Sequence, residues 1–186
     1  MTIAGPFEVL SVCGLRKVKE KPFNVYTVAQ QEVVTARKQS RVILYYMMDN
    51  CPIPDILLLP GGGGILPDDT PFGSRREMND GPLLDWIRRE NKTAEIFLSV
   101  CTCSLLLEKT GLLEGLSATT HWKAMDAMRA AAPSTTILPE ERWVDNGRII
   151  LSVGISAGPD MSLYVMSKLL GKEAADETAK YMHYKH

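Results

Sequence analysis

The residues with the clearest chemical potential lie where a predicted strand meets a predicted helix. Glu95–Val100 is predicted to be a buried strand and Ser104–Lys109 a helix, with Cys101 directly after the strand. This is the layout of a nucleophile elbow, a sharp turn that lifts a side chain above the sheet. A helix N-terminus favours thiolate over thiol, and the backbone N–H of Thr102 could act as an oxyanion donor. The alternative is a buried structural thiol, because free cysteine packs as a small hydrophobe.

A run of four glycines, Gly61–Gly64, follows a second predicted strand, Asp55–Pro60. No Gly-Lys-Ser/Thr follows the glycines, which excludes a P-loop, and their spacing does not match the dinucleotide-binding fingerprint. Two interpretations remain. The backbone N–H groups of the loop could donate to an oxyanion, or the loop is only a flexible connection.

The chain has three histidines, and two of them lie close to the C-terminus. The third, His121, follows the predicted short strand Ala118–Thr120, at the same end of the sheet as Cys101. It is therefore the plausible imidazole partner for the thiol. The alternative is a histidine at a helix N-terminus with a structural hydrogen bond. Asp126 and Asp160 are expected to be solvated or to cap helices.

The Cys101-x-Cys103 spacing suggests metal or disulfide chemistry only weakly. Zinc sites usually combine C-x₂₋₄-C with a second pair of ligands, and Cys13 and Cys51 supply no matching pair. Residues two apart on a helix do not face each other, so a disulfide is not expected. Cys103 is predicted to be a small residue beneath the elbow, and we predict no metal site and no cofactor.

Strands and helices alternate along the rest of the chain. The other predicted strands are Phe23–Val28, Arg41–Tyr46 and the hairpin Arg142–Val144 with Arg148–Leu151, which turns at Asn146-Gly147. The other predicted helices are Pro82–Glu90, Trp122–Ala131, Pro159–Leu170 and Glu173–Tyr184. Such alternation indicates an α/β domain with a mostly parallel sheet, whose ligands bind outside the carboxyl ends of the strands.

The composition is that of an ordinary globular protein. The 186 residues are predicted to form one domain, 1–186, and 45% of them are hydrophobic. The chain has 21 basic and 22 acidic residues. It therefore lacks the basic excess that would indicate a nucleic-acid partner. No apolar run reaches the ~18–20 residues of a membrane span, and no secretory signal is visible. Four cysteines do not suggest a disulfide framework, which favours a cytoplasmic location.

Several motifs together resemble the ThiJ/PfpI superfamily, a branch of the class I glutamine-amidotransferase-like fold. They are Gly5–Leu10, Pro60-Gly61-Gly62, Ser99–Thr102, Thr110–Gly115, Ala118–Trp122, Trp143–Gly147 and Gly154–Asp160. The resemblance covers essentially the whole chain. It is greatest to the isonitrile hydratases and to the ligand-sensing domains of AraC-type regulators.

The resemblance implies a flavodoxin-like three-layer sandwich that is usually a homodimer and takes a small-molecule substrate or effector. From the charge balance we expect no nucleic-acid partner, and no membrane is expected. The resemblance also implies roles for particular residues: Cys101 as nucleophile, Thr102, Gly62 and Gly63 as oxyanion donors, and Ile155 and Ser156 at the border of the pocket. His121 is assigned as the partner of Cys101 from its position in the sequence.

The sequence departs from the family pattern in three places. Cys103 stands where the family typically has glycine. The acid of the isonitrile hydratase branch lies three residues before the Gly-Pro and maps to Thr2, which cannot exchange a proton near neutral pH. The family's first, central strand should precede Gly5. We expect either an upstream start that supplies this strand or direct pairing of Phe23–Val28 with Asp55–Leu59.

The sequence therefore supports a cysteine-dependent hydratase or hydrolase acting on a small electrophile, of the isonitrile hydratase kind. The alternative is a non-catalytic or weakly catalytic redox- or metabolite-sensing domain, favoured by Thr2 at the position of the acid and by Cys103. Glyoxalase- or deglycase-like chemistry ranks lower because those branches usually place a glutamate on the first strand. Nothing in the sequence specifies peptide recognition.

Overall fold

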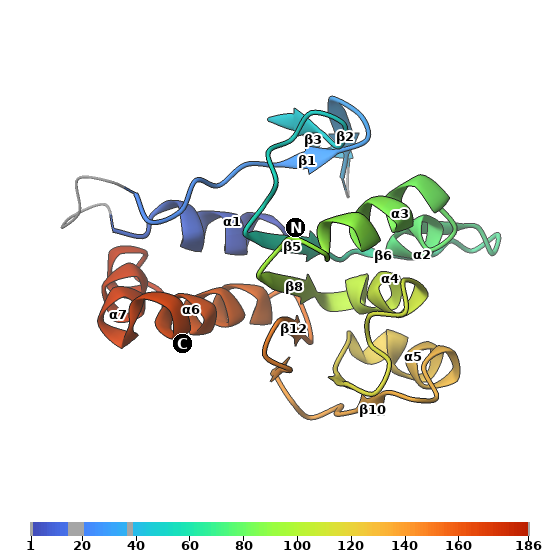
Figure 1. Ribbon diagram of the computed structural model, residues 1–186. Helices are drawn as coiled ribbons and strands as arrows, with labels where there is room; N and C mark the ends of the chain where they lie inside the picture. The colour runs from blue at the N-terminus through green and yellow to red at the C-terminus, as the bar shows by residue number, and fades with distance from the viewer. Residues whose placement is uncertain (1, 15–20, 37–38, 186) are drawn as a thin grey trace.

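The computed structural model describes residues 2–14, 21–36 and 39–185, which fold around a four-stranded sheet of order β11-β12-β8-β5 (Figure 1). The strands are β5 (Ile56–Pro60), β8 (Ile96–Val100), β11 (Trp143–Asp145) and β12 (Ile149–Ser152). β5, β8 and β12 run parallel, and β11 returns antiparallel to β12. The predicted α/β class with a mostly parallel sheet is confirmed.

The register brings the carboxyl ends of the three parallel strands to one edge. Val100, the last residue of β8, pairs with Pro60 on one side and with Ser152 on the other. The segments that follow these three residues therefore begin side by side. This edge is where a parallel sheet places its ligands, and it is where the candidate residues of the sequence gather.

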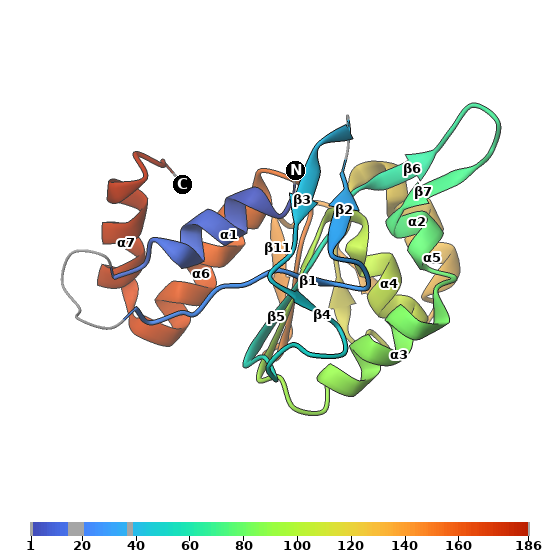
Figure 2. The same ribbon diagram turned by 90° about the horizontal axis from the view of Figure 1, so that it is seen from above.

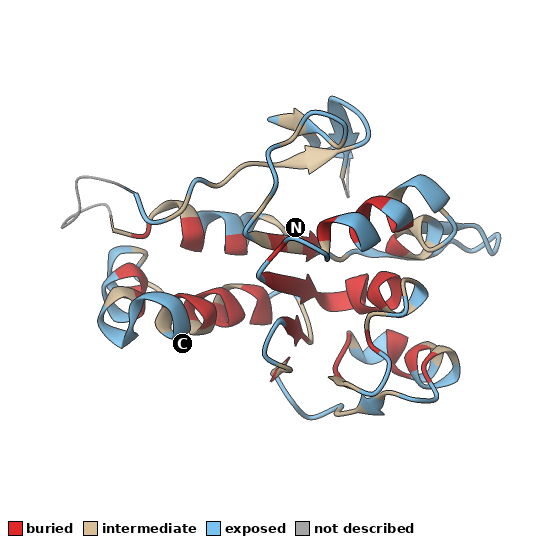
Figure 3. Ribbon diagram, viewed as in Figure 1, coloured by how far each residue is buried: buried red, intermediate tan, exposed pale blue. Residues whose placement is uncertain are grey.

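Helices cover both faces of the sheet, giving three layers (Figure 2). One face carries α1 (Ala4–Ser11), α6 (Ala157–Leu170) and α7 (Lys172–Tyr181), and the other carries α2 (Ser74–Glu77), α3 (Gly81–Glu90), α4 (Ser104–Lys109) and α5 (Met125–Ala131). Alternate residues of β8 serve the two faces, since Leu98 packs with Met161 of α6 and Phe97 packs with the α3–α5 side. The buried residues concentrate in the sheet and on the helix faces toward it (Figure 3).

The helix α3 shows how local sequence sets an element. Asp80 caps the N-terminus, where its carboxylate accepts a hydrogen bond of 3.0 Å from the backbone N–H of Leu83. Pro82 stands in the first turn, where a missing N–H costs nothing. Leu84 and Ile87 are then buried on the inner side of the helix.

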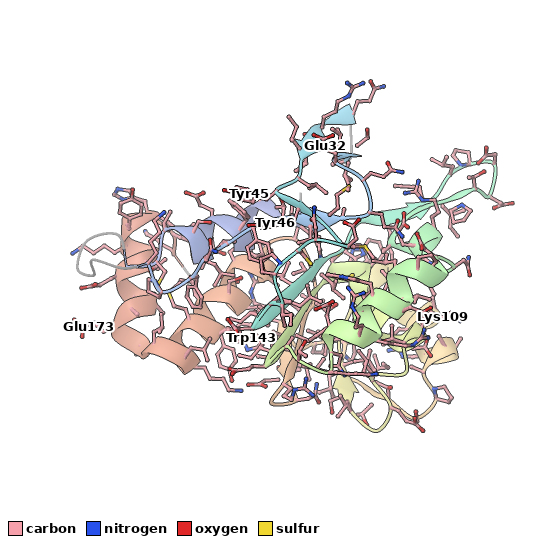
Figure 4. All side chains as sticks on the ribbon, turned by 45° about the horizontal axis from the view of Figure 1, so that its top comes forward. Glu32, Tyr45, Tyr46, Lys109, Trp143 and Glu173 are labelled. Carbon is pink, nitrogen blue, oxygen red and sulfur yellow. The ribbon has the colours of Figure 1, made fainter. Side chains whose placement is uncertain are left out.

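The chain between α1 and β5 forms a separate small β layer rather than an extension of the main sheet. It contains β1 (Val28–Ala29) paired with β4 (Tyr46–Met47), and the hairpin of β2 (Val33–Thr35) with β3 (Arg41–Ile43). The ring of Tyr46 contacts that of Tyr45, with 5.2 Å between their centroids, and both side chains are labelled in Figure 4.

The expected strand Phe23–Val28 is therefore wrong for most of its length, since residues 23–27 have no regular structure and β1 begins at Val28. The alternative pairing of this segment with Asp55–Leu59 is also wrong, because β1 pairs with β4. Among the described residues, β5 has a strand neighbour on one side only, which is β8. A β-rich sequence forms a strand only where a partner offers a continuous ladder of hydrogen bonds. In residues 23–27 the described backbone contact is limited to the carbonyl oxygen of Thr27, which accepts from the N–H groups of Tyr45 and Tyr46 where β1 begins.

Two further strand pairs and two 3₁₀ turns complete the described elements. β6 (Gly63–Ile65) pairs with β7 (Pro71–Gly73), so the glycine run continues into a hairpin rather than a simple loop. β9 (Ser117–Ala118) pairs with β10 (Thr136–Ile137), and the turns η2 (Cys101–Cys103) and η3 (Trp122–Ala124) precede α4 and α5. Within the described part of the chain, no helix is long and apolar enough to cross a membrane.

The tip of the β11–β12 hairpin is tied to α6 through Asp145. Its carboxylate accepts hydrogen bonds from Tyr164 Oη at 2.7 Å, Lys168 Nζ at 2.9 Å and the backbone N–H of Gly147 at 2.6 Å. Burial alone would raise the pKa of Asp145, but these three donors together lower it. A carboxyl group with a lowered pKa stabilises the fold above its ordinary pKa, and this contribution is lost as the pH falls through the folded value.

We therefore expect Asp145→Asn to destabilise the protein by about 1–2 kcal/mol at pH 7, because the amide cannot replace a carboxylate with three donors. The difference from wild type should shrink as the pH falls below about 4 and then through the lowered pKa of Asp145 in the folded protein. Urea unfolding at pH 7 and at about pH 2.5 measures both values. Asp126→Asn is the matched control, since the Asp126 side chain is fully exposed in its pair with Arg129. Equal stability of Asp145→Asn and wild type at pH 7 would refute this assignment.

Candidate active site

Cys101 occupies a strained turn between β8 and α4. Its φ angle is +64°, in the left-handed region that non-glycine residues rarely adopt. Such a conformation costs about 1–3 kcal/mol and persists only where the surroundings enforce it. β8 is buried along its whole length, and the Cys101 residue itself is 5% exposed. The predicted layout of a strand, a sharp turn and a helix is therefore present.

Two buried hydroxyl groups hold the turn from below. Thr120 Oγ1 donates to the carbonyl oxygen of Cys101 at 3.1 Å, and Ser104 Oγ donates to the same oxygen at 3.3 Å. Both side chains are fully buried. Because the left-handed turn points this carbonyl away from the sheet ladder, the hydroxyls satisfy a group that would otherwise be buried without a partner.

Gly61 lies directly against the elbow, at the end of β5. A Cβ atom on Gly61 would lie 2.2 Å from the carbonyl oxygen of Val100 and 2.8 Å from the backbone nitrogen of Thr102. No side chain fits at such distances, so the first glycine of the run allows the two chain segments to approach each other. The sequence pointed to Gly62 and Gly63, and the requirement at Gly61 follows only from the packing.

The hydroxyl of Thr102 joins the elbow to the glycine loop. Its Oγ1 accepts a hydrogen bond of 3.1 Å from the backbone N–H of Gly62 and lies 2.6 Å from Ser74 Oγ. The backbone N–H of Ser74 in turn donates to the carbonyl oxygen of Gly62 at 2.7 Å. The Gly62 N–H, which the resemblance assigns to an oxyanion, is thus occupied by Thr102, and Gly63 belongs to the β6–β7 ladder.

The protonation of Cys101 differs from the sequence-based expectation. Burial raises the pKa of the Cys101 thiol, and hydrogen bonds from the backbone N–H and the hydroxyl of Thr102 only partly offset this effect. The sequence-based expectation rests only on the donors at the helix N-terminus, which favour the thiolate, and does not include the opposing effect of burial. The donors act in the expected direction, but desolvation of the charge outweighs them.

Cys103 lies beneath the elbow, as predicted. It is 4% exposed and packs in the cluster on the α3–α5 side of the sheet. Burial raises the pKa of its thiol far above the ordinary range, with a further increase from the charge of Cys101. All four cysteines are free, so Cys101 and Cys103 do not form a disulfide. Cys103 is a packing residue in this structure.

Thr2 lies at the same end of the sheet as the elbow. It is 6% exposed, and its hydroxyl donates to the carbonyl oxygen of Gly61, the residue that packs against Cys101. The position to which the resemblance maps an acid is thus adjacent to the elbow. A threonine hydroxyl there supports the glycine backbone, but it is not a proton donor of the strength of a carboxylic acid.

His121 caps the 3₁₀ turn η3. Its Nδ1 accepts a hydrogen bond of 3.3 Å from the backbone N–H of Lys123, and its ring lies 5.7 Å from that of Trp122. No hydrogen bond joins His121 to Cys101 in the described structure. The capping interaction is the structural alternative considered for this histidine, and its role as the partner of the thiol stays a prediction.

The segment after β12 lies beside the elbow because Ser152 pairs with Val100. Ile155 is 54% exposed in this segment, and the carbonyl oxygen of Ser156 accepts a hydrogen bond of 3.1 Å from Arg142. Both residues therefore lie at the edge where the resemblance places the pocket border, and that role stays a prediction.

An ion pair anchors this segment to the body of the protein. Arg142 pairs with the carboxylate of Asp160, which is 7% exposed and also accepts a hydrogen bond of 2.7 Å from Tyr184 Oη. The expectation of a solvated or capping Asp160 is thus wrong, because a buried carboxylate needs partners. Asp126, by contrast, is fully exposed, as expected. No motif spacing in the sequence links Arg142, Asp160 and Tyr184.

Ser74 is the other residue at this edge that the sequence did not single out. It follows Gly73 at the start of the short helix α2, where a serine is ordinary. Only the β6–β7 hairpin brings it to Thr102. Among the residues that the structure describes, no group of three His, Cys, Asp or Glu side chains could hold a metal ion.

Comparisons with known proteins agree with this fold. The model of the DJ-1/PfpI family matches residues 4–168. The chain is 34% identical to isonitrile hydratase from Pseudomonas putida over 137 residues, which cover 73% of this chain and 54% of that protein. It is 30% identical to the HTH-type transcriptional regulator CdhR from Pseudomonas aeruginosa over 53% of this chain and 29% of the regulator. The chain thus spans about half the length of the first relative and less of the second.

Solved structures show the same architecture. A THiJ/PfpI family protein from Pseudomonas syringae superposes with a TM-score of 0.82 at 25% identity, over 98% of this chain and 69% of that one. DJ-1 from Schizosaccharomyces pombe gives a TM-score of 0.77 at 13% identity, over 99% and 93% of the two chains, and supports the flavodoxin-like fold alone. From its match to the family model and from its relatives, the chain belongs to the DJ-1/PfpI family.

Proposed function

We propose that this protein is a cysteine-dependent hydratase that adds water to a small isonitrile, with Cys101 as the nucleophile. The observation that carries the proposal is the strained, positive-φ elbow that presents the Cys101 thiol beside the backbone of Gly61 and Thr102. The 34% identity to isonitrile hydratase supports this substrate class. The thiol, rather than the fold, is the chemical basis of the proposal.

The proposed reaction balances in two steps. The sulfur of Cys101 bonds to the terminal carbon of R–N≡C, and a proton is delivered to the same carbon, which gives the thioimidate R–N=CH–S–Cys. Water then adds to that carbon, the nitrogen takes a proton, and the C–S bond breaks to release R–NH–CHO and the thiol. The sum is one isonitrile plus one water giving one formamide. The Cys101 thiol, whose raised pKa keeps it protonated, supplies the proton of the first step, because Thr2 provides no carboxylic acid.

Thr102 and the glycine loop have separate roles in this scheme. The N–H and hydroxyl of Thr102 already contact the sulfur and favour its ionised form. The N–H of Gly62, which now donates to Thr102 Oγ1, is the group that a negatively charged tetrahedral intermediate would capture. Ile155 supplies an exposed apolar side chain at the border for the organic group of the substrate.

We expect Cys101→Ala to reduce hydration of a simple alkyl isonitrile to the uncatalysed rate, a loss of about a thousandfold or more, because no other group can form the thioimidate. Formamide release followed by gas chromatography measures the rate. Cys13→Ala is the matched control, since Cys13 is an equally buried thiol in the α1/α6/α7 core. Turnover by Cys101→Ala at the wild-type rate would exclude the proposed mechanism.

A second candidate function is a redox- or metabolite-sensing domain with weak or no catalysis. The observation that favours it is Thr2, whose hydroxyl is engaged with Gly61 where the hydratase branch has an acid. The similarity to a transcriptional regulator is compatible with such a role. A sensor of peroxide needs an accessible thiolate, and the raised pKa of Cys101 opposes this at neutral pH.

The two functions differ in their response to peroxide. If Cys101 is a sensor, equimolar hydrogen peroxide at pH 7 should add oxygen to Cys101 before any other cysteine, as seen by intact mass and peptide mapping. If the protein is a hydratase, we expect Cys101 to oxidise no faster than the half-buried Cys51. Rapid, selective oxidation of Cys101 at pH 7 would favour the sensor over the hydratase.

We also propose that the protein acts as a homodimer, as the family resemblance implies. Large apolar side chains of the small β layer lie open, among them Ile43 at 76% and Tyr45 at 75% exposed. Apolar side chains gathered on one protruding element are typical of protein interfaces. Light scattering coupled to size-exclusion chromatography should give twice the 20.6 kDa of one chain, and the mass of a single chain would refute the dimer.

A further inference from the structure

Ser74 is a buried serine that the function described so far does not use. It is 5% exposed, and the β6–β7 hairpin brings it to Thr102, 28 residues later in the chain. Its backbone N–H donates to the carbonyl oxygen of Gly62 at 2.7 Å, which fixes the position of the residue. Its hydroxyl oxygen lies 2.6 Å from Thr102 Oγ1. Ser74 is thus held rigidly one hydrogen bond away from a direct neighbour of Cys101.

The hydrogen-bonding capacity of Thr102 limits how this contact can be arranged. A hydroxyl group has one proton to donate and two lone pairs to accept with. The N–H of Gly62, at 3.1 Å, takes one lone pair of Thr102 Oγ1, because an amide can only donate. The remaining lone pair and the single proton are shared between Ser74 and the sulfur of Cys101, which the Thr102 hydroxyl also contacts.

The ionisation of the thiol decides the direction of the contact. A thiolate has no proton, so Thr102 must donate its own proton to the sulfur. Ser74 must then donate to the lone pair of Thr102 that remains. In this arrangement the proton and both lone pairs of the Thr102 hydroxyl each make one hydrogen bond. The O–H groups of Ser74 and Thr102 then form a chain that points toward the negative charge on the sulfur. Hydrogen bonds aligned in such a chain polarise and strengthen one another.

We propose that Ser74 is a positioning residue, whose hydroxyl donates to Thr102 Oγ1 and thereby directs the one hydroxyl proton of Thr102 to the sulfur of Cys101. Ser74 touches neither the sulfur nor the reacting carbon. It acts only through Thr102, and it prevents the Thr102 proton from turning away from the thiolate. The inference rests on the proposed role of Cys101 as the nucleophile.

The chain of hydroxyl groups from Ser74 to Thr102 is the principal polar support of the Cys101 thiolate. The described groups that bond around the elbow come from η2, α4, α2, the turn at Gly61 and Gly62, and Thr120, and they are hydroxyls and backbone groups. The titratable group electrostatically coupled to Cys101 is Cys103, and burial keeps its thiol protonated. A change in the Cys101 thiol on removal of the Ser74 hydroxyl therefore reports on the hydroxyl chain.

The test is the pH dependence of alkylation of Cys101 by iodoacetamide, followed between pH 6.5 and 10 by peptide mass mapping so that the other three cysteines do not interfere. We expect Ser74→Ala to slow alkylation about three- to tenfold at pH 8 and to shift the profile upward by about half to one pH unit. Ser74→Thr, which keeps the hydroxyl, should restore the wild-type profile. Ser162→Ala is the matched control, because Ser162 is a buried serine whose hydroxyl donates to Gly158 within α6.

A double-mutant cycle separates this role from general loosening of the elbow. Because Ser74 acts through Thr102, Ser74→Ala should have no further effect on the profile in a Thr102→Val background. An unchanged profile for Ser74→Ala overturns the proposal, and so does an equal slowing in the Thr102→Val background. If Ser74→Ala does not fold, as judged by thermal unfolding, Ser74→Cys gives the same comparison, because the thiol keeps the side-chain volume and is a much weaker donor than the hydroxyl.

The readout does not depend on the identity of the substrate. If the wild-type protein does not hydrate isonitriles but the alkylation profiles behave as expected, the proposed function fails and the role of Ser74 stands. If isonitriles are hydrated, kcat of Ser74→Ala should fall by the same three- to tenfold factor while KM stays unchanged, because the residue is remote from the organic group of the substrate. A change in KM alone would count against a role in thiol ionisation.

Discussion

The positive φ of Cys101 is the constraint on which the whole site depends. β8 lies between β5 and β12 and cannot move, so the chain must turn sharply as soon as Val100 completes its pairing. Two hydroxyl groups stabilise the resulting geometry by donating hydrogen bonds to the displaced carbonyl oxygen of Cys101. Gly61 must then be a glycine, because the turn occupies the space of its side chain. The sheet thus stores strain at Cys101, the residue that we propose as the nucleophile.

The same burial that enforces the turn also opposes ionisation of the thiol. Desolvation penalises a thiolate more strongly than the donors of Thr102 stabilise it, and the pKa of Cys101 is raised as a result. A hydratase can tolerate this, since only a small fraction of thiolate is needed when the substrate is a reactive electrophile. A sensor of dilute peroxide cannot, because its rate at neutral pH depends directly on the thiolate fraction.

The local sequence pattern was sufficient to predict those elements whose caps, turns and apolar spacing lie within the element itself. The caps and apolar spacing of α3, the continuous apolar run of β5 and the Asn-Gly turn of the β11–β12 hairpin lead to the observed elements with small shifts at their ends. The strand predicted at residues 23–27 does not form because a strand needs a continuous ladder with a neighbour, and the position of the neighbour is not encoded in the strand itself. Cys101, Thr102 and the glycine loop lie together at one edge of the sheet because their positions follow from the order of the elements.

The remaining parts of the site could not be predicted, because they depend on contacts between distant segments. Ser74 reaches Thr102 only through the β6–β7 hairpin, and Asp160 meets Arg142 and Tyr184 only after α6 has packed with the segments that precede β11 and follow α7. The direction of the pKa shift at Cys101 also needed the burial of its surroundings, since the helix N-terminus alone indicated the opposite sign.

Proton delivery is the step on which the two functional interpretations diverge. Thr2 donates its hydroxyl proton to the carbonyl of Gly61, so this side chain stabilises the glycine backbone instead of serving the substrate. Hydration nevertheless needs a proton at the isonitrile carbon, and a buried thiol that is mostly protonated carries one. The raised pKa of Cys101 lowers the fraction of thiolate and so weakens the nucleophile. It also means that the thiol keeps a proton beside Thr2, the position to which the resemblance maps the acid. A thiol of ordinary acidity would give up this proton more readily at alkaline pH and leave solvent water as the donor.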